Sequence, residues 1–260
     1  MTVIEQAVDA LQKARKVVFF TGAGISADSG IPTYREKLSG IWAGYDPRDL
    51  ETAKAFRENP ALVWGWYLWR RLRVAQAEPN AAHRAIPRLA NSQRQVSVIT
   101  QNIDDLHERA GSFNVVHLHG SLTKPKCFAC HRPAVVSPDQ SAVPDEGALI
   151  DPPRCQRCNG KMRPAVVWYG EDLPPQAWKT AVQLVKDCDL LVSVGTSGIV
   201  MPAAGLPDLA LASGASVIHV NKVDVAMGEP REFMLMGGGA EVLSMLFERI
   251  ETGKSRGLGL

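Results

Sequence analysis

Short runs of apolar residues recur along the chain, and they have the length of buried β-strands. They lack polar alternation, as expected for parallel strands that are covered on both faces. We predict strands over residues 17–20, 96–100, 115–119, 165–169, 190–194 and 216–220. Helix-like segments lie between most of them, at residues 81–91, 174–187 and 240–250. Strands that alternate with helices predict an α/β fold with a Rossmann-like, doubly wound parallel sheet.

Two segments interrupt this alternation. Residues from about 36 to 79 are helical in pattern and rich in tryptophan. Residues from about 124 to 163 are rich in Cys, Pro and Arg and poor in apolar side chains. The second segment cannot hold a core of its own without a covalent or metal staple. We therefore expect two smaller modules inserted in the α/β core.

One position in the first of these modules conflicts with its surroundings. In VWGWYLWRRLR, Val63 to Arg73, helical spacing places Val63, Trp66 and Tyr67 in one apolar stripe. Arg70 falls inside this stripe. A guanidinium in a largely apolar setting is costly unless another group satisfies it, so Arg70 is expected to have a specific partner.

Composition narrows the functional classes. The 260 residues are 45% hydrophobic and 22% charged, with a formal net charge of +2, so nothing favours nucleic-acid or membrane binding. No apolar run approaches the roughly 18 residues that cross a bilayer. The first 16 residues are typical of an amphipathic helix and lack the apolar core and cleavage site of a signal peptide. We expect a cytoplasmic protein.

Four of the five cysteines form two Cys-x2-Cys pairs, Cys127 with Cys130 and Cys155 with Cys158. In a reducing compartment this spacing indicates metal rather than disulfides. Zinc in a structural site takes four thiolates in a tetrahedron, and each pair presents two sulfurs to one ion. Since no coordination position stays open, we predict one structural zinc. Cys188 precedes an apolar run and is expected to be a small buried side chain.

A glycine-rich turn follows the first strand, in VVFFTGAGISADSGIPTYR. Gly22 and Gly24 would let the backbone approach a pyrophosphate, and the next N–H groups would face the anion. A plain tight turn is the alternative, because such a stretch alone is weak evidence. The acidic ribose-binding residue that is usual about 20 positions on is not obvious, and Glu36 comes too soon, so the stretch is not an ordinary dehydrogenase fingerprint.

Two further loops strengthen the case for a dinucleotide site. TQNIDDLHERAG places Asn102 and Asp104 after the strand at 96–100, and VGTSGIV follows the strand at 190–194. Ligands of α/β folds gather at the carboxyl ends of strands. His119, in VVHLHG, ends a strand, and Gly120 would leave room for a ligand beside it. His119 is the best general-base candidate of the six histidines, although a histidine at a strand end is often structural.

Together these motifs resemble the sirtuins, which are NAD-dependent protein deacylases. GAGISADSGIPTYR, TQNIDDLHERAG, HLHG, the two cysteine pairs, PAVVWYGEDLP, GTSGIVMPAAGLP and HVN occur in the order of that family, from about residue 5 to 250. The resemblance implies one catalytic domain over residues 1–255, with a helical module at 36–79 and a zinc-binding module at 124–163.

The resemblance also implies roles for individual residues. His119, Asn102 and Asp104 would be catalytic, with His119 as general base. The contacts to NAD would come from Gly22, Ala23, Gly24, Tyr34, Arg35, Gln101, Asn102, Ile103, Asp104, Gly195, Thr196, Ser197, Asn221 and Ala240. An extended acyl-lysine peptide would pair with Val167, Trp168, Tyr169 and Gly170 as an added strand.

The implied reaction removes an acyl group from lysine and gives nicotinamide and O-acyl-ADP-ribose. Two alternatives stay open: mono-ADP-ribosyl transfer to a protein, and a non-catalytic NAD-sensing zinc module. Protein substrates that carry acyl-lysine are the expected partners, and nothing in the sequence sets an oligomeric state.

The resemblance gives Arg70 a possible partner. Tyr67 and Arg70 match the Tyr-x-x-Arg pair of class III sirtuins, which implies removal of succinyl or malonyl groups as well as acetyl, with succinyl ahead. An internal salt bridge to Glu51 is the alternative. Glu51 also departs from the small alanine that is usual there, and its carboxylate could compete for Arg70.

Overall fold

The computed structural model describes residues 1–31, 40–91, 93–135 and 143–256. Within them, six strands form a parallel sheet in the order β3-β2-β1-β6-β7-β8. Their bounds are β1 Lys16–Thr21, β2 Gln95–Thr100, β3 Val115–His117, β6 Leu190–Val194, β7 Ser216–Asn221 and β8 Glu232–Met236. The predicted doubly wound α/β fold is confirmed.

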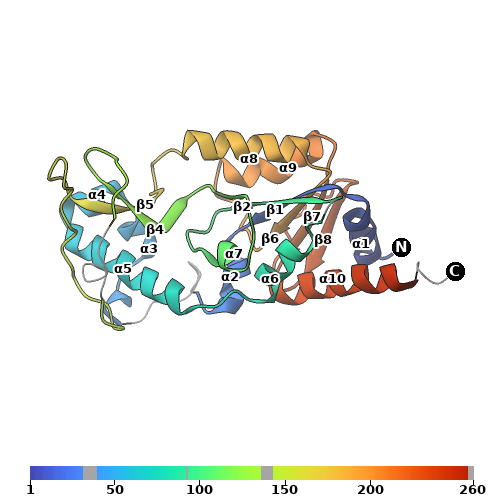
Figure 1. Cartoon of the computed structure of the whole chain (residues 1–260), viewed down its shortest axis with the longest axis horizontal. Coiled ribbons are helices and arrows are strands. Elements are labelled where there is room, and N and C mark those ends of the chain that lie inside the picture. The colour runs from blue at the N-terminus through green and yellow to red at the C-terminus, as the bar shows by residue number, and fades with distance from the viewer. Residues whose placement is uncertain (32–39, 92, 136–142, 257–260) are drawn as a thin grey trace.

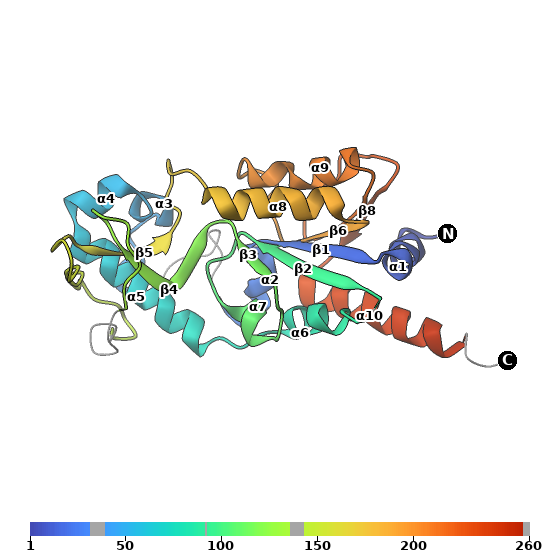
Figure 2. The ribbon, with the colours of Figure 1, turned by 45° about the horizontal axis from the view of Figure 1, so that its top comes forward.

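Helices cover both faces of the sheet (Figures 1 and 2). One face carries α1 Val3–Lys13, α6 Ala81–Arg88 and α10 Gly239–Arg256, and the other carries α8 Pro175–Asp187 and α9 Leu206–Ala212. Successive residues of β1 serve the two cores, since Phe19 packs with the first set of helices and Phe20 with the second. This burial on both faces explains the continuous apolar runs of the strands.

The expected amphipathic N-terminal helix is α1. Thr2 is its N-cap and forms a reciprocal capping box with Glu5, in which each side chain accepts from the other residue's backbone N–H. Its buried residues, Ala7 and Leu11, lie four apart and face the sheet. The described residues also form the short 3₁₀ helices η1 Ala27–Ser29, η2 Gly40–Trp42 and η4 Ala203–Gly205.

A smaller lobe projects from one end of the sheet (Figures 1 and 2). It contains the helices α3 Pro47–Leu50, α4 Ala53–Glu58 and α5 Pro60–Gln76, and an antiparallel pair of strands, β4 Gly120–Cys127 and β5 Met162–Val166. The tryptophans of α5 lie in the core of this lobe, with Trp42, Phe56 and Trp168. Residues 47–76 of the expected helical module and the ends of the expected zinc module therefore pack on each other.

Two strand predictions need correction. The run at 165–169 does not join the parallel sheet, because its first residues pair with β4 and the chain leaves the ladder after Val166. The run at 115–119 is broken after His117, so His119 lies in the turn between β3 and β4. Strands β4 and β8 were not predicted.

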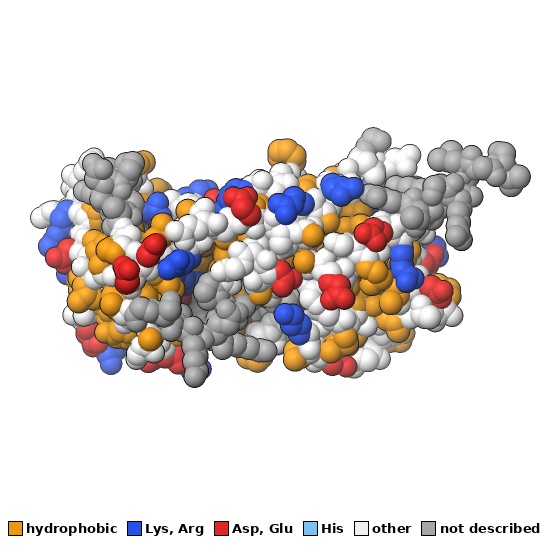
Figure 3. Space-filling view, turned by 90° about the horizontal axis from the view of Figure 1, so that it is seen from below, with side chains coloured by type: hydrophobic (Ala, Val, Ile, Leu, Met, Phe, Trp, Pro, Cys, Tyr) orange, Lys and Arg blue, Asp and Glu red, His pale blue; other side chains and the backbone are white. Residues whose placement is uncertain are grey.

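The surface agrees with the small net charge. The described part of the face in Figure 3 shows acidic and basic side chains interspersed rather than gathered by sign. Among the described helices none has the length and the apolar character that crossing a membrane requires.

Candidate functional site: a crevice at the carboxyl edge of the sheet

The strand order reverses between β1 and β6. At such a point the loops that leave adjacent strands diverge, and a crevice opens at the carboxyl edge of the sheet. The loops after β1, β2, β6 and β7 all start at this edge. The helix α2 Ala23–Ser26 follows β1 directly.

Backbone contact between the first and third loops explains three of the glycines. A Cβ on Gly22 would lie 2.8 Å from the carbonyl oxygen of Gly195, and one on Gly24 would lie 2.6 Å from the Gly195 Cα. Gly195 has a φ of +62°, which favours glycine. The missing side chains thus make room for a neighbouring loop, and the Gly24 N–H donates to the Gly195 carbonyl at 3.0 Å.

Asn102 and Asp104 are brought together with a residue that the sequence reasoning missed, Ser26. The Asn102 Nδ2 donates to the Ser26 Oγ at 3.0 Å and to the Gly22 carbonyl at 3.2 Å, and the Ser26 hydroxyl donates to Asp104 at 3.1 Å. All three side chains are buried, and burial raises the pKa of Asp104. The position of Ser26, four residues after Gly22 on the same turn, was the available signal.

Two buried histidines contact Thr21 and Ser26, and the sequence reasoning missed both of them. The His107 Nε2 lies 2.9 Å from the Thr21 hydroxyl, and the His83 Nε2 lies 3.5 Å from the Ser26 hydroxyl. Burial lowers the pKa of His107 to about 3 and that of His83 to about 4, so both rings are neutral near pH 7. Both are buried as uncharged polar groups next to the loops after β1 and β2.

His119 is half-buried, and its ring is oriented by the loop that carries Asn102. Its Nδ1 lies 2.9 Å from the Gln101 carbonyl oxygen. A carbonyl only accepts, so Nδ1 carries the proton and Nε2 keeps its lone pair. Burial lowers the pKa of His119, which maintains this neutral form near pH 7. His119 thus has the tautomer and the charge state of a general base.

The space beside Gly120 is not free for a ligand, contrary to the prediction. A Cβ there would lie 2.0 Å from the carbonyl oxygen of Ala165 in β5, and the φ of Gly120 is +77°. The glycine therefore serves the close approach of β5 to the turn that carries His119. The Ile103 carbonyl accepts from the Leu122 N–H at 3.0 Å, which fixes the Asn102 loop to the same strand pair.

The residues expected on the adenosine side lie after β6, at the end of β7 and at the start of α10. The Asn221 Nδ2 donates to the Thr196 carbonyl at 2.6 Å, while Ser197 is exposed beside it. Ala240 lies in the first turn of α10, where a Cβ on the neighbouring Gly239 would be 3.0 Å from Val194 in β6. Tyr34 and Arg35 lie outside the described residues.

The segment expected to pair with the peptide, residues 167–170, directly follows β5 in the smaller lobe. Three of its N–H groups already have acceptors: Val167 donates to His119 at 2.9 Å, Trp168 to the Glu171 side chain at 3.0 Å, and Tyr169 to Glu51 at 2.9 Å. Tyr169 and Gly170 are exposed. Any strand added here would have to use the remaining backbone groups.

The partner of Arg70 is Glu51, as the alternative prediction had it. The Arg70 guanidinium makes a salt bridge to the Glu51 carboxylate, and the side chains are only 18% and 7% exposed. Both residues make further interactions besides this one. The Tyr67 hydroxyl accepts a hydrogen bond of 2.9 Å from the Trp168 indole. Tyr67 and Arg70 share one face of α5, with the Arg70 Cζ 5.8 Å from the Tyr67 ring centroid.

The four paired cysteines meet in space. Their sulfurs all lie within 4.8 Å of one another, with Cys127 and Cys158 at 3.5 Å and Cys130 and Cys155 at 3.9 Å. Bonds of about 2.3 Å to one zinc would place tetrahedral sulfurs about 3.8 Å apart. The N–H groups of Cys158 and Arg157 lower the pKa of Cys155, while neighbouring sulfurs raise the pKa of Cys158, as expected for close sulfurs that compete for one proton. The geometry and the donor set fit one structural zinc.

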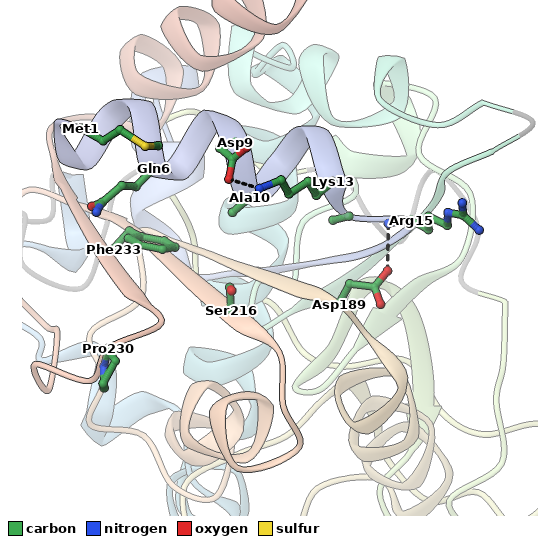
Figure 4. Close-up of a pocket in the computed structure, with 11 residues that line it drawn as sticks. Met1, Gln6, Asp9, Ala10, Lys13, Arg15, Asp189, Ser216, Pro230 and Phe233 are labelled. Carbon is green, nitrogen blue, oxygen red and sulfur yellow. Dashed lines mark hydrogen bonds and ion pairs between the residues drawn. The ribbon is translucent and has the colours of Figure 1, made fainter.

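A hollow of about 570 Å³ lies at the opposite edge of the sheet (Figure 4). Its lining includes Arg15 and Asp189, which stand just before β1 and β6, and Ser216, which starts β7. These are the amino ends of the strands. Since ligands of open α/β sheets bind at the carboxyl ends, this hollow does not belong to the candidate site.

Known proteins with similar sequences belong to the family that these features indicate. A sequence profile described as the Sir2 family matches residues 22–202. An "NAD-dependent protein deacylase 4" of Pseudomonas syringae pv. tomato is 64% identical over 251 residues, covering 96% of this chain and 98% of the relative. An "NAD-dependent protein deacylase" of Pseudomonas putida is 65% identical over 248 residues, covering 95% of each.

Solved structures show the same likeness. A Sir2 homolog–NAD complex superposes with a TM-score of 0.84 at 38% identity, covering 96% of this chain and 94% of that one. Sir2Af2 bound to a myristoylated histone peptide superposes with a TM-score of 0.74 at 33% identity, covering 98% of both. The resemblance drawn from the motifs is thereby confirmed, and the chain belongs to the Sir2 family, the sirtuins.

Proposed function

We propose that this protein is an NAD-dependent protein-lysine deacylase that releases nicotinamide and O-acyl-ADP-ribose. The observation that carries the proposal is the state of His119, a neutral histidine whose Nδ1 is held by Gln101, in a crevice with buried Asn102 and Asp104. A site that only senses NAD has no need of an oriented base. The relatives named above are deacylases, and one solved relative binds NAD.

The crevice residues fit NAD. Buried amide, hydroxyl and carboxyl groups of Asn102, Ser26 and Asp104 suit the polar ribose and nicotinamide, and Thr196 and Asn221 suit the adenosine side. The other proposed contacts to NAD are the glycines of the first and third loops and the residues Ala23, Tyr34, Arg35, Gln101, Ile103, Ser197 and Ala240. Bound NAD would supply an electrophilic ribose carbon, from which nicotinamide can leave.

His119 and its surroundings would then do the protein's part of the chemistry. The Nε2 of His119 would accept the proton of a ribose hydroxyl, and the Gln101 carbonyl would stabilise the resulting imidazolium through Nδ1. Asn102 and Asp104, held by Ser26, would orient the ribose and nicotinamide without reorganising. The segment 167–170, hydrogen-bonded to the His119 carbonyl, would place the acyl-lysine peptide beside the base.

We propose that Tyr67 and Arg70 extend the acyl range to succinyl and malonyl. Phenol and guanidinium groups on one helix face suit a terminal carboxylate. Glu51 competes for the same guanidinium and so reduces the advantage of a charged acyl group. Acetyl-lysine, which has no carboxylate to place, would not depend on this pair.

We further propose one catalytic domain over residues 1–255, with the helical module 36–79 and the zinc module 124–163 inserted in it. The cysteine cluster would bind one structural zinc, and thiols kept for metal suit the cytoplasm. Acyl-lysine proteins would be the partners. We propose no role for nucleic acid or membranes.

The test measures nicotinamide release from NAD with and without an acyl-lysine peptide. A deacylase releases nicotinamide only with the acylated peptide and forms the deacylated peptide in equal amount. Label transferred from NAD to protein would instead support the ADP-ribosyltransferase, and NAD binding without release would support the sensor. The His119→Ala variant controls for contaminating activity.

A further inference from the structure

Arg163 in β5 is a buried cation outside the groups considered so far. Its side chain is only 1% exposed. Its guanidinium lies over the Trp168 indole, with the Arg163 Cζ 3.3 Å from the ring centroid. A guanidinium buried this deeply requires hydrogen-bond partners on most of its N–H groups.

The partners all belong to the segment that follows Arg163 in the chain. Its Nη2 donates to the Val166 carbonyl at 2.8 Å and to the Glu171 carboxylate at 2.9 Å, and Nη1 pairs with the other Glu171 oxygen. Its Nε donates to the Pro164 carbonyl at 3.2 Å. The β4–β5 ladder ends at Val166, and beyond that point the Arg163 guanidinium, rather than a neighbouring strand, donates the hydrogen bonds that hold the chain.

Glu171 closes the same turn from its other end. Its carboxylate accepts the Trp168 N–H at 3.0 Å, and its own N–H donates to the Trp168 carbonyl at 2.9 Å. Burial alone would raise the pKa of Glu171, but the hydrogen bonds from Arg163 and from the Trp168 N–H lower it. The chain from 166 to 171 is thus wrapped around one ion pair.

This wrapped segment contains the residues that we propose to meet the peptide. We propose that Arg163 and Glu171 are positioning residues for the acyl-lysine peptide, which hold Val167 to Gly170 in the conformation that accepts it. The inference rests on the proposed function, since it assumes that the peptide binds along this segment. Neither side chain needs to touch the peptide, because each acts through the backbone of the turn.

The chemistry of the pair predicts which substitutions disturb it. Only a planar guanidinium can stack on Trp168 and reach two carboxylate oxygens together, so Arg163→Lys keeps the charge and loses the geometry. Glu171→Gln keeps an acceptor for the Trp168 N–H and loses the ion pair. The double variant R163M/E171L removes both charges, a replacement that is often neutral for stability.

The experiment compares these three variants with wild type and with Asp9→Asn, which disturbs the exposed Asp9–Lys13 pair of α1. Zinc content and the thermal midpoint establish that each variant is folded. The readouts are KM for an acetyl-lysine peptide at saturating NAD and KM for NAD at saturating peptide.

We expect the peptide KM to rise about tenfold in each of the three variants, equivalent to about 1.4 kcal/mol. The KM for NAD should stay within about twofold, and Asp9→Asn should leave both unchanged. General loosening of the fold would raise both KM values or lower kcat alone, and either result would overturn the inference. R163M/E171L decides the question if a single variant fails to fold. An inactive wild type would instead refute the proposed function.

Discussion

The salt bridge between Glu51 and Arg70 leads to a prediction about acyl selectivity. Glu51→Gln removes one negative charge and keeps the size of the side chain. In the wild type a succinyl carboxylate at Arg70 would share the guanidinium with Glu51, so attraction to the cation is offset by repulsion from the acid. In the variant only the attraction remains. We therefore expect Glu51→Gln to improve the succinyl-lysine substrate and to leave acetyl-lysine nearly unchanged.

The magnitude follows from charge and burial. Two carboxylates on different edges of one guanidinium lie roughly 7 Å apart, which costs about 2.4 kcal/mol at an effective dielectric constant of about 20. The side chain of Arg70 is 18% exposed and that of Glu51 is 7% exposed, so solvent screening is partial. Allowing for it, we expect a gain of about 1.4 to 2 kcal/mol, which is roughly ten- to thirtyfold in kcat/KM.

The assay uses one peptide with either a succinyl or an acetyl group on its lysine. It compares wild type, Glu51→Gln, Arg70→Met and the double variant E51Q/R70M. In the Glu51→Gln background, loss of Arg70 should cost the succinyl substrate about 2–4 kcal/mol and barely affect the acetyl one. Glu58→Gln, at an exposed pair on α4, is the matched control. If Glu51→Gln changes both substrates by one factor, Arg70 does not face the acyl group.

Three further predictions concern the base, the metal and the buried histidines. His119→Ala should keep the fold and the zinc but lower the turnover rate by a factor of about 10² to 10⁴, and full activity of this variant would contradict the role of His119 as a base. Because burial lowers the pKa of His119, the acid limb of the wild-type kcat/KM profile should lie below pH 6.5. Cys155→Ser should release zinc, measured with a chromogenic chelator, and lower the thermal midpoint, since three thiolates bind more weakly than four; a stable, metal-loaded variant would contradict it. His83 and His107 have folded pKa values below the unfolded 6.5, so the unfolded chain binds more protons in acid, and each should cost about 2 kcal/mol of stability between pH 6.5 and 5. Urea unfolding across that range should show a shallower pH slope for His107→Gln, and an unchanged slope would contradict the assignment.

Much of the α/β core could be predicted because its signal is local. Buried parallel strands are apolar on both faces, so the runs at β1, β2, β6 and β7 stand out from a single sequence. The signal for the cysteine cluster is also local, because two residues between the cysteines of each pair are enough to present both sulfurs from one turn. The carboxyl edge of the sheet could be expected to gather Asn102, Asp104 and Thr196 from topology alone.

The rest depends on contacts between distant segments. The run at 165–169 has the composition of a core strand, and only its pairing with β4 places part of it in the small lobe. Gly120 follows His119 and was expected to leave room for a ligand, but the Ala165 carbonyl occupies the space beside it. Such contacts arise from tertiary packing, which a residue pattern does not encode.

Two ion pairs among the described residues of the small lobe both belong to acids that accept N–H groups of one short segment. Glu51 accepts the Tyr169 N–H through its carbonyl, and Glu171 accepts the Trp168 N–H through its carboxylate. Each acid also pairs with an arginine, Arg70 in one case and Arg163 in the other. Because the proposed acyl group and the proposed peptide backbone would meet the same segment, a change in either pair should be felt at both. Acyl selectivity and peptide affinity are therefore expected to be coupled, with the backbone of Trp168 and Tyr169 as the physical link.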